Sequence, residues 1–236
     1  GGTDLATAGE FICKQPGIIG NSVKVVVVDN GSWTSFVADD TMVSEDRHLS
    51  VYVKSGQPKT SEGAFAATGN DGLNDEMHIF VIDATGAITG VVGRIIELWE
   101  GLSKLTTVSD YLGRNVYYAN FINNYSNWLY WGAHPTPGVT GTLDWGIGVG
   151  DITGTNPQFK QLTAAYDVAM AGGDLGADDY AGELATKATD LNTAFDMFLN
   201  KDVYNVMYLI TCDFPVATQS HVVTSVAEVR KDAMAV

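Results

Sequence analysis

The sequence is poor in cysteine and has no long apolar run. Only Cys13 and Cys212 occur among its 236 residues. One disulfide is possible, but two buried free thiols fit their apolar surroundings better. The longest apolar candidate, Val23 to Val28, is far shorter than the roughly 20 residues that span a bilayer, so we expect no membrane insertion. The first residues, Gly1 to Asp4, lack the charged start and apolar stretch of a signal peptide.

Basic residues are also scarce. The chain has 13 lysines and arginines against 28 aspartates and glutamates, a formal net charge of −15. A nucleic-acid partner would require a basic face, and so would an anionic membrane surface. We therefore expect no nucleic-acid partner. The charge favours solubility, or complementarity to a basic partner surface.

Catalytic and metal-binding motifs are missing as well. There is no nucleophile elbow, no phosphate loop and no dinucleotide fingerprint. The acidic groups around Asn70–Asp75 and Asp174–Asp179 lack the ligand order of an EF-hand, and turn formation or helix capping explains them better. Glu97 and Glu100 flank Trp99 and are interpreted as solvated residues at a strand end. The histidines are too scattered to form a metal site: His48, His78, His134 and His221. We predict no catalytic, cofactor-binding or metal-binding residues, no cofactor, and no enzyme.

The first hundred residues predict antiparallel β-structure. Val23–Asp29 is apolar on both faces and reads as a buried strand. Met77–Asp83 alternates, and a tight turn at Asp83–Gly86 leads into a return strand that ends near Leu98. The stretch Gly31–Glu76 is rich in turn residues and holds one short strand, Leu49–Lys54.

The later residues change period. A helix is predicted over 110–125, with Asp110 at its start, and a short aromatic strand follows at Trp128–Trp131. Glycines then predict a loop to Gly154. Helices over 183–199 and 219–231 alternate with strands at 204–211 and near Val236, the order of an α/β unit. The fold class expected is therefore α+β: an antiparallel β-rich domain with flanking helices over residues 1–160, followed by part of an α/β domain over residues 161–236.

One aromatic group is a candidate interface: Trp128, Tyr130, Trp131 and Trp145. Alternation places Trp128 and Tyr130 on one face of the strand and Trp131 on the other. Half of the group is expected in the core. An exposed half could form a protein contact or stack on sugar rings.

Five motifs follow one another along the chain. A Pro-Gly turn and a Gly-Asn turn precede the valine strand in Pro16–Val28, and Ile79–Asp83 precedes Glu97-Leu98-Trp99-Glu100-Gly101-Leu102-Ser103. Three more come later: Asp110-Tyr111-Leu112-Gly113-Arg114, Ala171-Gly172-Gly173-Asp174, and the helix and strand from Ala194 to Ile210. In this order they resemble the sheath proteins of contractile bacteriophage tails, and the resemblance covers roughly residues 8–236.

The resemblance implies a structural function. Sheath subunits stack as hexameric rings around the tail tube, and contraction drives the tube through the host envelope by rearranged contacts, without nucleotide hydrolysis. The implied partners are other sheath subunits, the tail tube protein and baseplate proteins. The implied location is the virion, after assembly in the host cytoplasm. Residues 1–160 would be the outer, protruding domain and 161–236 the start of the inner domain, so the chain is expected to be a fragment.

Two alternatives remain open. One is a sheath from a related contractile injection system, of the tailocin or type VI kind. The other, from a different class, is an extracellular carbohydrate-binding or adhesive module built on the β-rich half and its tryptophans.

Overall fold

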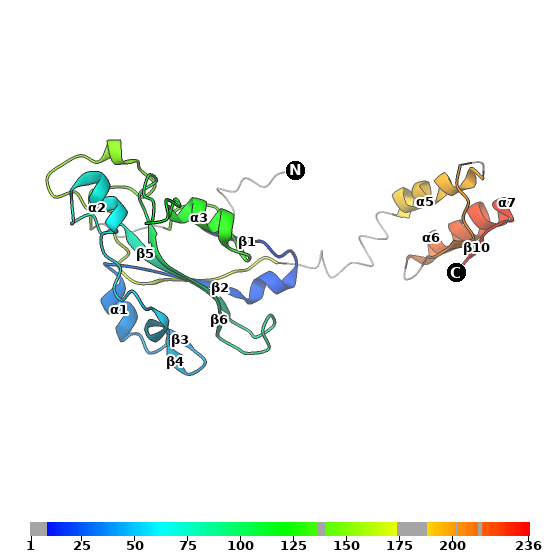
Figure 1. Ribbon diagram of the computed structural model, residues 1–236. Coiled ribbons are helices and arrows are strands. Elements are labelled where there is room, and N and C mark those ends of the chain that lie inside the picture. Colours follow the sequence, from blue (N-terminus) through cyan, green and yellow to red (C-terminus); the bar gives the residue numbers. More distant parts are fainter. Residues whose placement is uncertain (1–8, 136–139, 174–187, 202, 212–213) are drawn as a thin grey trace. The chain divides into compact units, whose positions relative to one another are not determined.

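The structure, a computed structural model, describes residues 9–135, 140–173, 188–201, 203–211 and 214–236. It divides into a first unit, Gly1–Gly173, and a second unit, Asp174–Val236 (Figure 1). The division falls after Gly173 and not after residue 160. The reason is strand β8 (Tyr166–Ala169), which pairs with β2 (Val23–Asp29) and so belongs to the first unit.

A four-stranded antiparallel sheet forms the centre of the first unit. Its strand order is β6 (Arg94–Ser103), β5 (Glu76–Asp83), β2, β8. Val23 lies opposite Asp83, and Asp29 lies opposite Met77. This arrangement confirms the antiparallel β-structure expected from the sequence, although β6 runs five residues beyond the end expected at Leu98.

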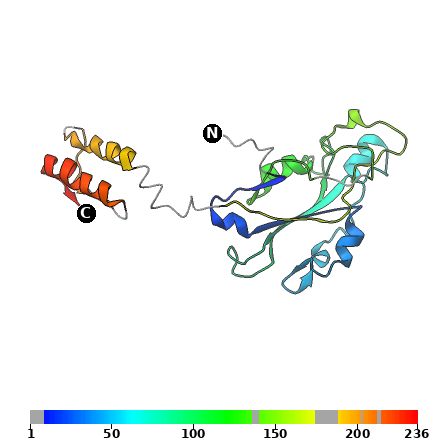
Figure 2. The same ribbon diagram turned by 180° about the vertical axis from the view of Figure 1, so that it is seen from behind.

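Both faces of this sheet are covered. On one face Val25, Val27 and Ile79 pack against α2 (Glu62–Thr68), α3 (Tyr118–Tyr125) and the ribbon of β1 (Phe11–Cys13) with β7 (Leu129–Trp131). On the other face Val26 and Phe80 pack against α1 (Trp33–Ala38) and the segment with β3 (Val43–Ser44) and β4 (Arg47–His48). Figures 1 and 2 show these elements on opposite sides of the sheet. Burial on both faces explains the unbroken run of valines in β2.

The turn-rich interpretation of residues 31–76 is wrong in part. The segment forms α1, α2 and a 3-10 helix at Leu49–Tyr52, where a strand was expected. Ser61 caps α2 by accepting a hydrogen bond from the backbone N–H of Ala64, and Gly69 ends it at φ +66°. These helices are too short to produce a clear helical period, so the polar caps and glycines dominate the sequence pattern.

Two further expectations are corrected. Residues 84–93 form a long loop between β5 and β6, not a tight turn at Asp83–Gly86. The Asp83 carboxylate organises this loop by accepting hydrogen bonds from the backbone of Gly86, Ile88 and Thr89. Burial opposes ionisation of Asp83, but these donors outweigh it and hold its pKa below the usual value.

Helix α3 begins at Tyr118, not near residue 110. The strand expected at 128–131 is confirmed as β7.

The second unit is a small β–α–β arrangement. Strand β9 (Tyr208–Leu209) pairs in parallel with β10 (Met234–Ala235). One continuous helix connects them, formed by α6 (Val216–His221), a π-helical stretch (Val222–Ala227) and α7 (Glu228–Arg230). Helix α5 (Ala188–Asp196) precedes them; the part of its predicted range over 183–187 lies outside the described residues. The buried core comprises Leu209, Val222, Val226 and Ala227. Val229, near the end of the same helix, is exposed.

Candidate interaction surfaces

A fully buried ion pair lies at one end of the central sheet. The Lys104 ammonium lies 2.8 Å from Asp29 Oδ2, and both side chains are fully buried. Lys104 also donates to the carbonyl of Lys160 at 3.1 Å and lies 4.6 Å from the centre of the Trp145 ring. Burial lowers the pKa of Lys104, and the Asp29 carboxylate opposes that effect. The pair joins the end of β2 to the residue after β6.

Hydrogen-bond donors from the protein surround this ion pair. Asp29 Oδ1 accepts from the backbone N–H and hydroxyl of Ser32, and Asp29 Oδ2 also accepts from the N–H of Leu162. Nearby, the Asp75 carboxylate accepts from Ser61 and Ser103. A substrate would need access to these groups, and the packing provides none. The site therefore fixes the ends of the strands.

Three polar residues have the composition of a catalytic triad but not its geometry. Ser55 Oγ lies 3.5 Å from His78 Nε2, and it donates to Glu100 at 2.7 Å. His78 Nδ1 accepts from the N–H of Gly101, so Nε2 carries the proton and donates to the carbonyl of Gly56. A histidine in this tautomer has no lone pair directed at the serine. Burial lowers the pKa of His78.

The two glutamates beside Trp99 were expected to be solvated, but both are half-buried and their carboxylates accept hydrogen bonds. Glu97 accepts from the Ser126 hydroxyl at 2.6 Å and from the backbone N–H of Asn127 at 2.7 Å. Glu100 accepts from the N–H groups of Lys54 and Ser55. Burial acts against ionisation of Glu100, but these donors lower its pKa overall. Both carboxylates anchor loops onto the edge strand β6.

The aromatic group is distributed between core and surface. Trp145 is buried, and its indole N–H donates to the carbonyl of Lys160 at 2.6 Å. Trp128 and Trp131 are half-buried against the core, and Trp131 donates to the Tyr118 hydroxyl. Tyr130 alone of the four is exposed, with the Lys14 ammonium 4.7 Å from its ring centre. The structure therefore does not bring the four together as one exposed surface.

The remaining candidates from the sequence have ordinary roles where they are described. Within the described ranges no group of histidine, cysteine, aspartate and glutamate could hold a metal ion. Asn70 accepts from the N–H of Gly72, as expected for a turn residue. Cys13 is a free thiol but only half-buried, and burial raises its pKa. Cys212 and the acidic residues at 174–179 lie outside the described residues.

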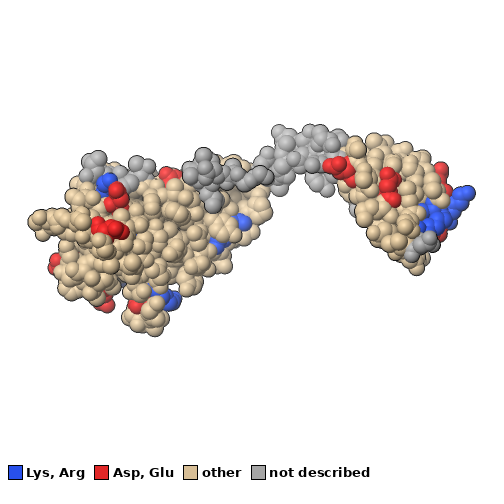
Figure 3. All heavy atoms as spheres, turned by 90° about the horizontal axis from the view of Figure 1, so that it is seen from above, with Lys and Arg blue, Asp and Glu red and all other residues tan. Residues whose placement is uncertain are grey.

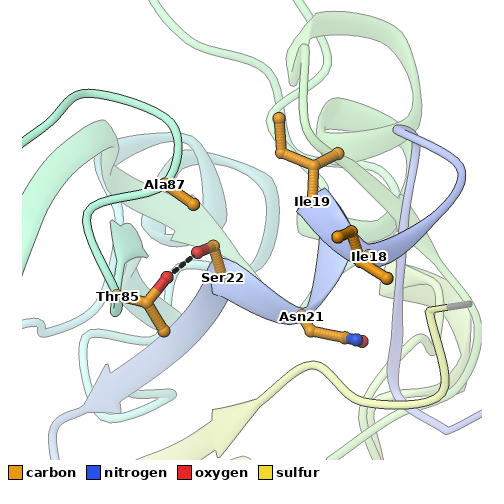
Figure 4. A pocket seen from close by; sticks show the side chains of 6 residues that line it. All are labelled: Ile18, Ile19, Asn21, Ser22, Thr85 and Ala87. Carbon is orange, nitrogen blue, oxygen red and sulfur yellow. Dashed lines mark hydrogen bonds between the residues drawn. The ribbon is translucent and has the colours of Figure 1, made fainter.

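An apolar hollow opens at the other end of the sheet in the first unit. It has a volume of about 370 Å³ and is lined by Ile18, Ile19, Asn21, Ser22, Thr85 and Ala87. Figure 4 shows the side chains of Ile18 and Ile19 on one side and Ala87 on the other, with the Ser22–Thr85 hydrogen bond beside them. Its lining offers a hydrophobic contact and no reactive group.

The second unit exposes one whole face of its parallel strand pair. Leu209 points toward the helices and is buried, while its neighbours Tyr208 and Ile210 are 58% and 62% exposed. In the partner strand Met234 and Val236 are 61% and 64% exposed. Parallel strands normally have both faces covered. We call these four residues the open face. Sequence analysis missed it, although the unbroken apolar run Met207–Ile210 signals a strand with two apolar faces.

Neither the protein-family models nor the curated proteins that were searched match this sequence. Among the described residues, no helix has the length and apolar character needed to cross a bilayer.

Proposed function

We propose that this protein is a structural subunit of a bacteriophage contractile tail sheath, which acts by packing against other protein subunits. The open face of the second unit carries this proposal. Four large apolar side chains on one side of two short strands form the kind of contiguous patch that marks a protein–protein contact. The order of the sequence motifs supplies the particular family.

The form of the rest of the molecule supports an assembly role. The buried charged groups of the first unit are enclosed and hold strand ends together, as a mechanical scaffold requires. Most of the surface seen in Figure 3 carries neither acidic nor basic side chains, with charged groups in isolated places. Large uncharged surfaces of this kind suit repeated contacts between subunits.

In this proposal the first unit is the outer domain and the second unit belongs to the α/β inner domain. The partners are other sheath subunits, the tail tube protein and baseplate proteins, and the location is the virion tail. A sheath of a related contractile injection system fits the same observations. An adhesive or sugar-binding module finds less support, because three of its four candidate aromatic residues are buried or half-buried.

Electron microscopy of the product of the complete reading frame that encodes this sequence tests the proposal. A sheath subunit should form tubes of stacked rings. Ile210→Lys, which places a charge on the open face, should abolish the tubes, whereas Arg47→Glu, at an exposed site on the first unit, should leave them. Failure to form any ordered polymer, together with specific binding on a glycan array, would replace the sheath by the adhesive module.

A further inference from the structure

The turn between Ser109 and Asn115 presents two large side chains to solvent. Tyr111 is 91% exposed and Leu112 is 62% exposed. The sequence motif here was expected to start a helix, but the structure shows a closed turn, and Ser109 and Asn115 form an isolated bridge at its base. Large apolar side chains exposed at a tip usually belong to a contact.

This turn is held rigid by its own residues. Asp110 accepts from the backbone N–H groups of Leu112 and Arg114, both at 2.9 Å, and from the Arg114 guanidinium at 2.7 and 2.8 Å. Gly113 takes φ +78° and donates its N–H to the Asp110 carbonyl. The backbone at Tyr111 and Leu112 is thus held in place before any partner binds, which lowers the entropic cost of binding.

Beside the turn lies a cavity of about 220 Å³, between α2 and the start of β5. Glu62, Glu76, Gly63, Gly101, Asp110 and Tyr111 are among its lining residues. Neither Glu62 nor Glu76 forms an ion pair within the part of the chain that the structure describes. Burial raises the pKa of Glu76, although the N–H and the positive charge of Lys59 act in the opposite direction. A cation in the cavity would relieve that electrostatic cost.

We propose that the Tyr111–Leu112 turn and its cavity form a docking surface for a partner protein that inserts an arginine side chain. The guanidinium lies between Glu62 and Glu76, Tyr111 stacks on its plane, and Leu112 covers its aliphatic part. The acidic residues of the cavity favour a cation, and the exposed ring favours a planar one. Arginine meets both conditions, whereas the compact and more strongly hydrated lysine ammonium meets only the first. This surface lies on the first unit and is independent of the open face.

Nuclear magnetic resonance of the 15N-labelled chain tests the proposal. The probe is N-acetyl-arginine methylamide, and its matched control is the citrulline analogue, which has nearly the same shape but no charge. The arginine probe should cause saturable shifts of the amides of Gly63, Gly101 and Tyr111. The citrulline probe should leave them unchanged. Shifts of equal size with both probes, or no shifts with arginine, would overturn the proposal.

Three variants sharpen the test. Glu76→Gln and Tyr111→Ala should each weaken binding of the arginine probe by about threefold to fivefold, the effect of losing one exposed ion pair or cation–π contact. Tyr130→Ala, which removes another exposed tyrosine of the same unit, should leave the affinity unchanged. The spectra themselves report whether each variant is folded. Unchanged affinity in both Glu76→Gln and Tyr111→Ala would contradict the proposed site.

Discussion

The two units of this chain differ in how many faces of their β-strands are covered by other residues. In the first unit the two central strands, β2 and β5, are covered on both faces, and their valines and isoleucines are buried. The strand pair of the second unit is covered on one face only. The buried side-chain atoms without a hydrogen-bond partner, among the residues described, are Asn192 Oδ1 and Thr218 Oγ1, both in the second unit. In our proposal, contact with another subunit covers the open face of the second unit, whereas the first unit covers its central strands with its own residues.

Spectroscopy can follow the two units separately. All five tryptophans lie in the first unit, at positions 33, 99, 128, 131 and 145. Tryptophan fluorescence therefore reports unfolding of the first unit, while far-ultraviolet circular dichroism reports both. If the comparison holds, denaturant melts should show an earlier circular dichroism transition, for the second unit, that fluorescence does not detect.

The largest effect is expected at the buried ion pair. Asp29→Ala leaves the Lys104 charge buried without its partner, and it also removes the acceptor for Ser32 and Leu162. We expect the first unit to lose about 3–5 kcal/mol of unfolding free energy, measured by fluorescence-detected denaturant melts. Asp144→Ala is the control, because the Lys160–Asp144 pair is largely exposed; it should cost less than about 1 kcal/mol. Equal costs would mean that the pair does not fix the strand ends.

A smaller loss is expected from Glu97→Ala. This change removes the acceptor for Ser126, Asn127 and the Trp99 indole, so loop 126–127 loses its attachment to β6. The first unit should lose about 1.5–3 kcal/mol, again measured by fluorescence. Glu62→Ala, an exposed glutamate with no ion pair in the described part of the chain, should stay within about 0.5 kcal/mol. If Glu97→Ala is as mild as Glu62→Ala, the hydrogen bonds of Glu97 do not stabilise the attachment of the loop to β6.

Acid should lower the unfolding free energy of the first unit, because His78 is buried. Its pKa is lowered by burial from the usual 6.5, so below pH 6.5 the unfolded chain binds a proton that the folded unit does not. Stability from this group is therefore complete above pH 6.5 and is lost as the pH falls toward its lowered pKa. Fluorescence melts between pH 7 and about pH 5 measure this slope. His78→Gln should flatten it; His134 adds to the slope in the same direction. A slope that His78→Gln leaves unchanged would assign the loss to other groups.

The sequence predicted those parts of the fold that depend on local pattern. Val23–Asp29 and Met77–Asp83 form the strands expected, because β-branched and apolar side chains predominate in both segments. The turn at Asp110 could not be foreseen, since an aspartate that accepts backbone N–H groups forms a local turn as readily as it caps the start of a helix. The same limit applies to partners distant in sequence. Glu97 meets Ser126, and Trp145 covers Lys104, only after the chain has folded.

The smallest change in stability is expected on the open face, where it decides the comparison between the units. Ile210→Thr replaces a side chain that is already mostly exposed, so the unfolding free energy of the second unit should change by less than about 0.5 kcal/mol. Leu209→Thr is the matched control: it is the preceding residue of the same strand, points the opposite way and lies buried against Val222 and Val226. It should cost more than about 2 kcal/mol, because it places a hydroxyl in that small core. Circular dichroism melts measure both variants. Binding of an apolar dye should fall in Ile210→Thr, since one of the four exposed side chains becomes polar. If Ile210→Thr destabilises the unit as much as Leu209→Thr does, Ile210 is packed within the chain itself. Both faces of the strand pair in the second unit would then be covered, as in the central strands of the first.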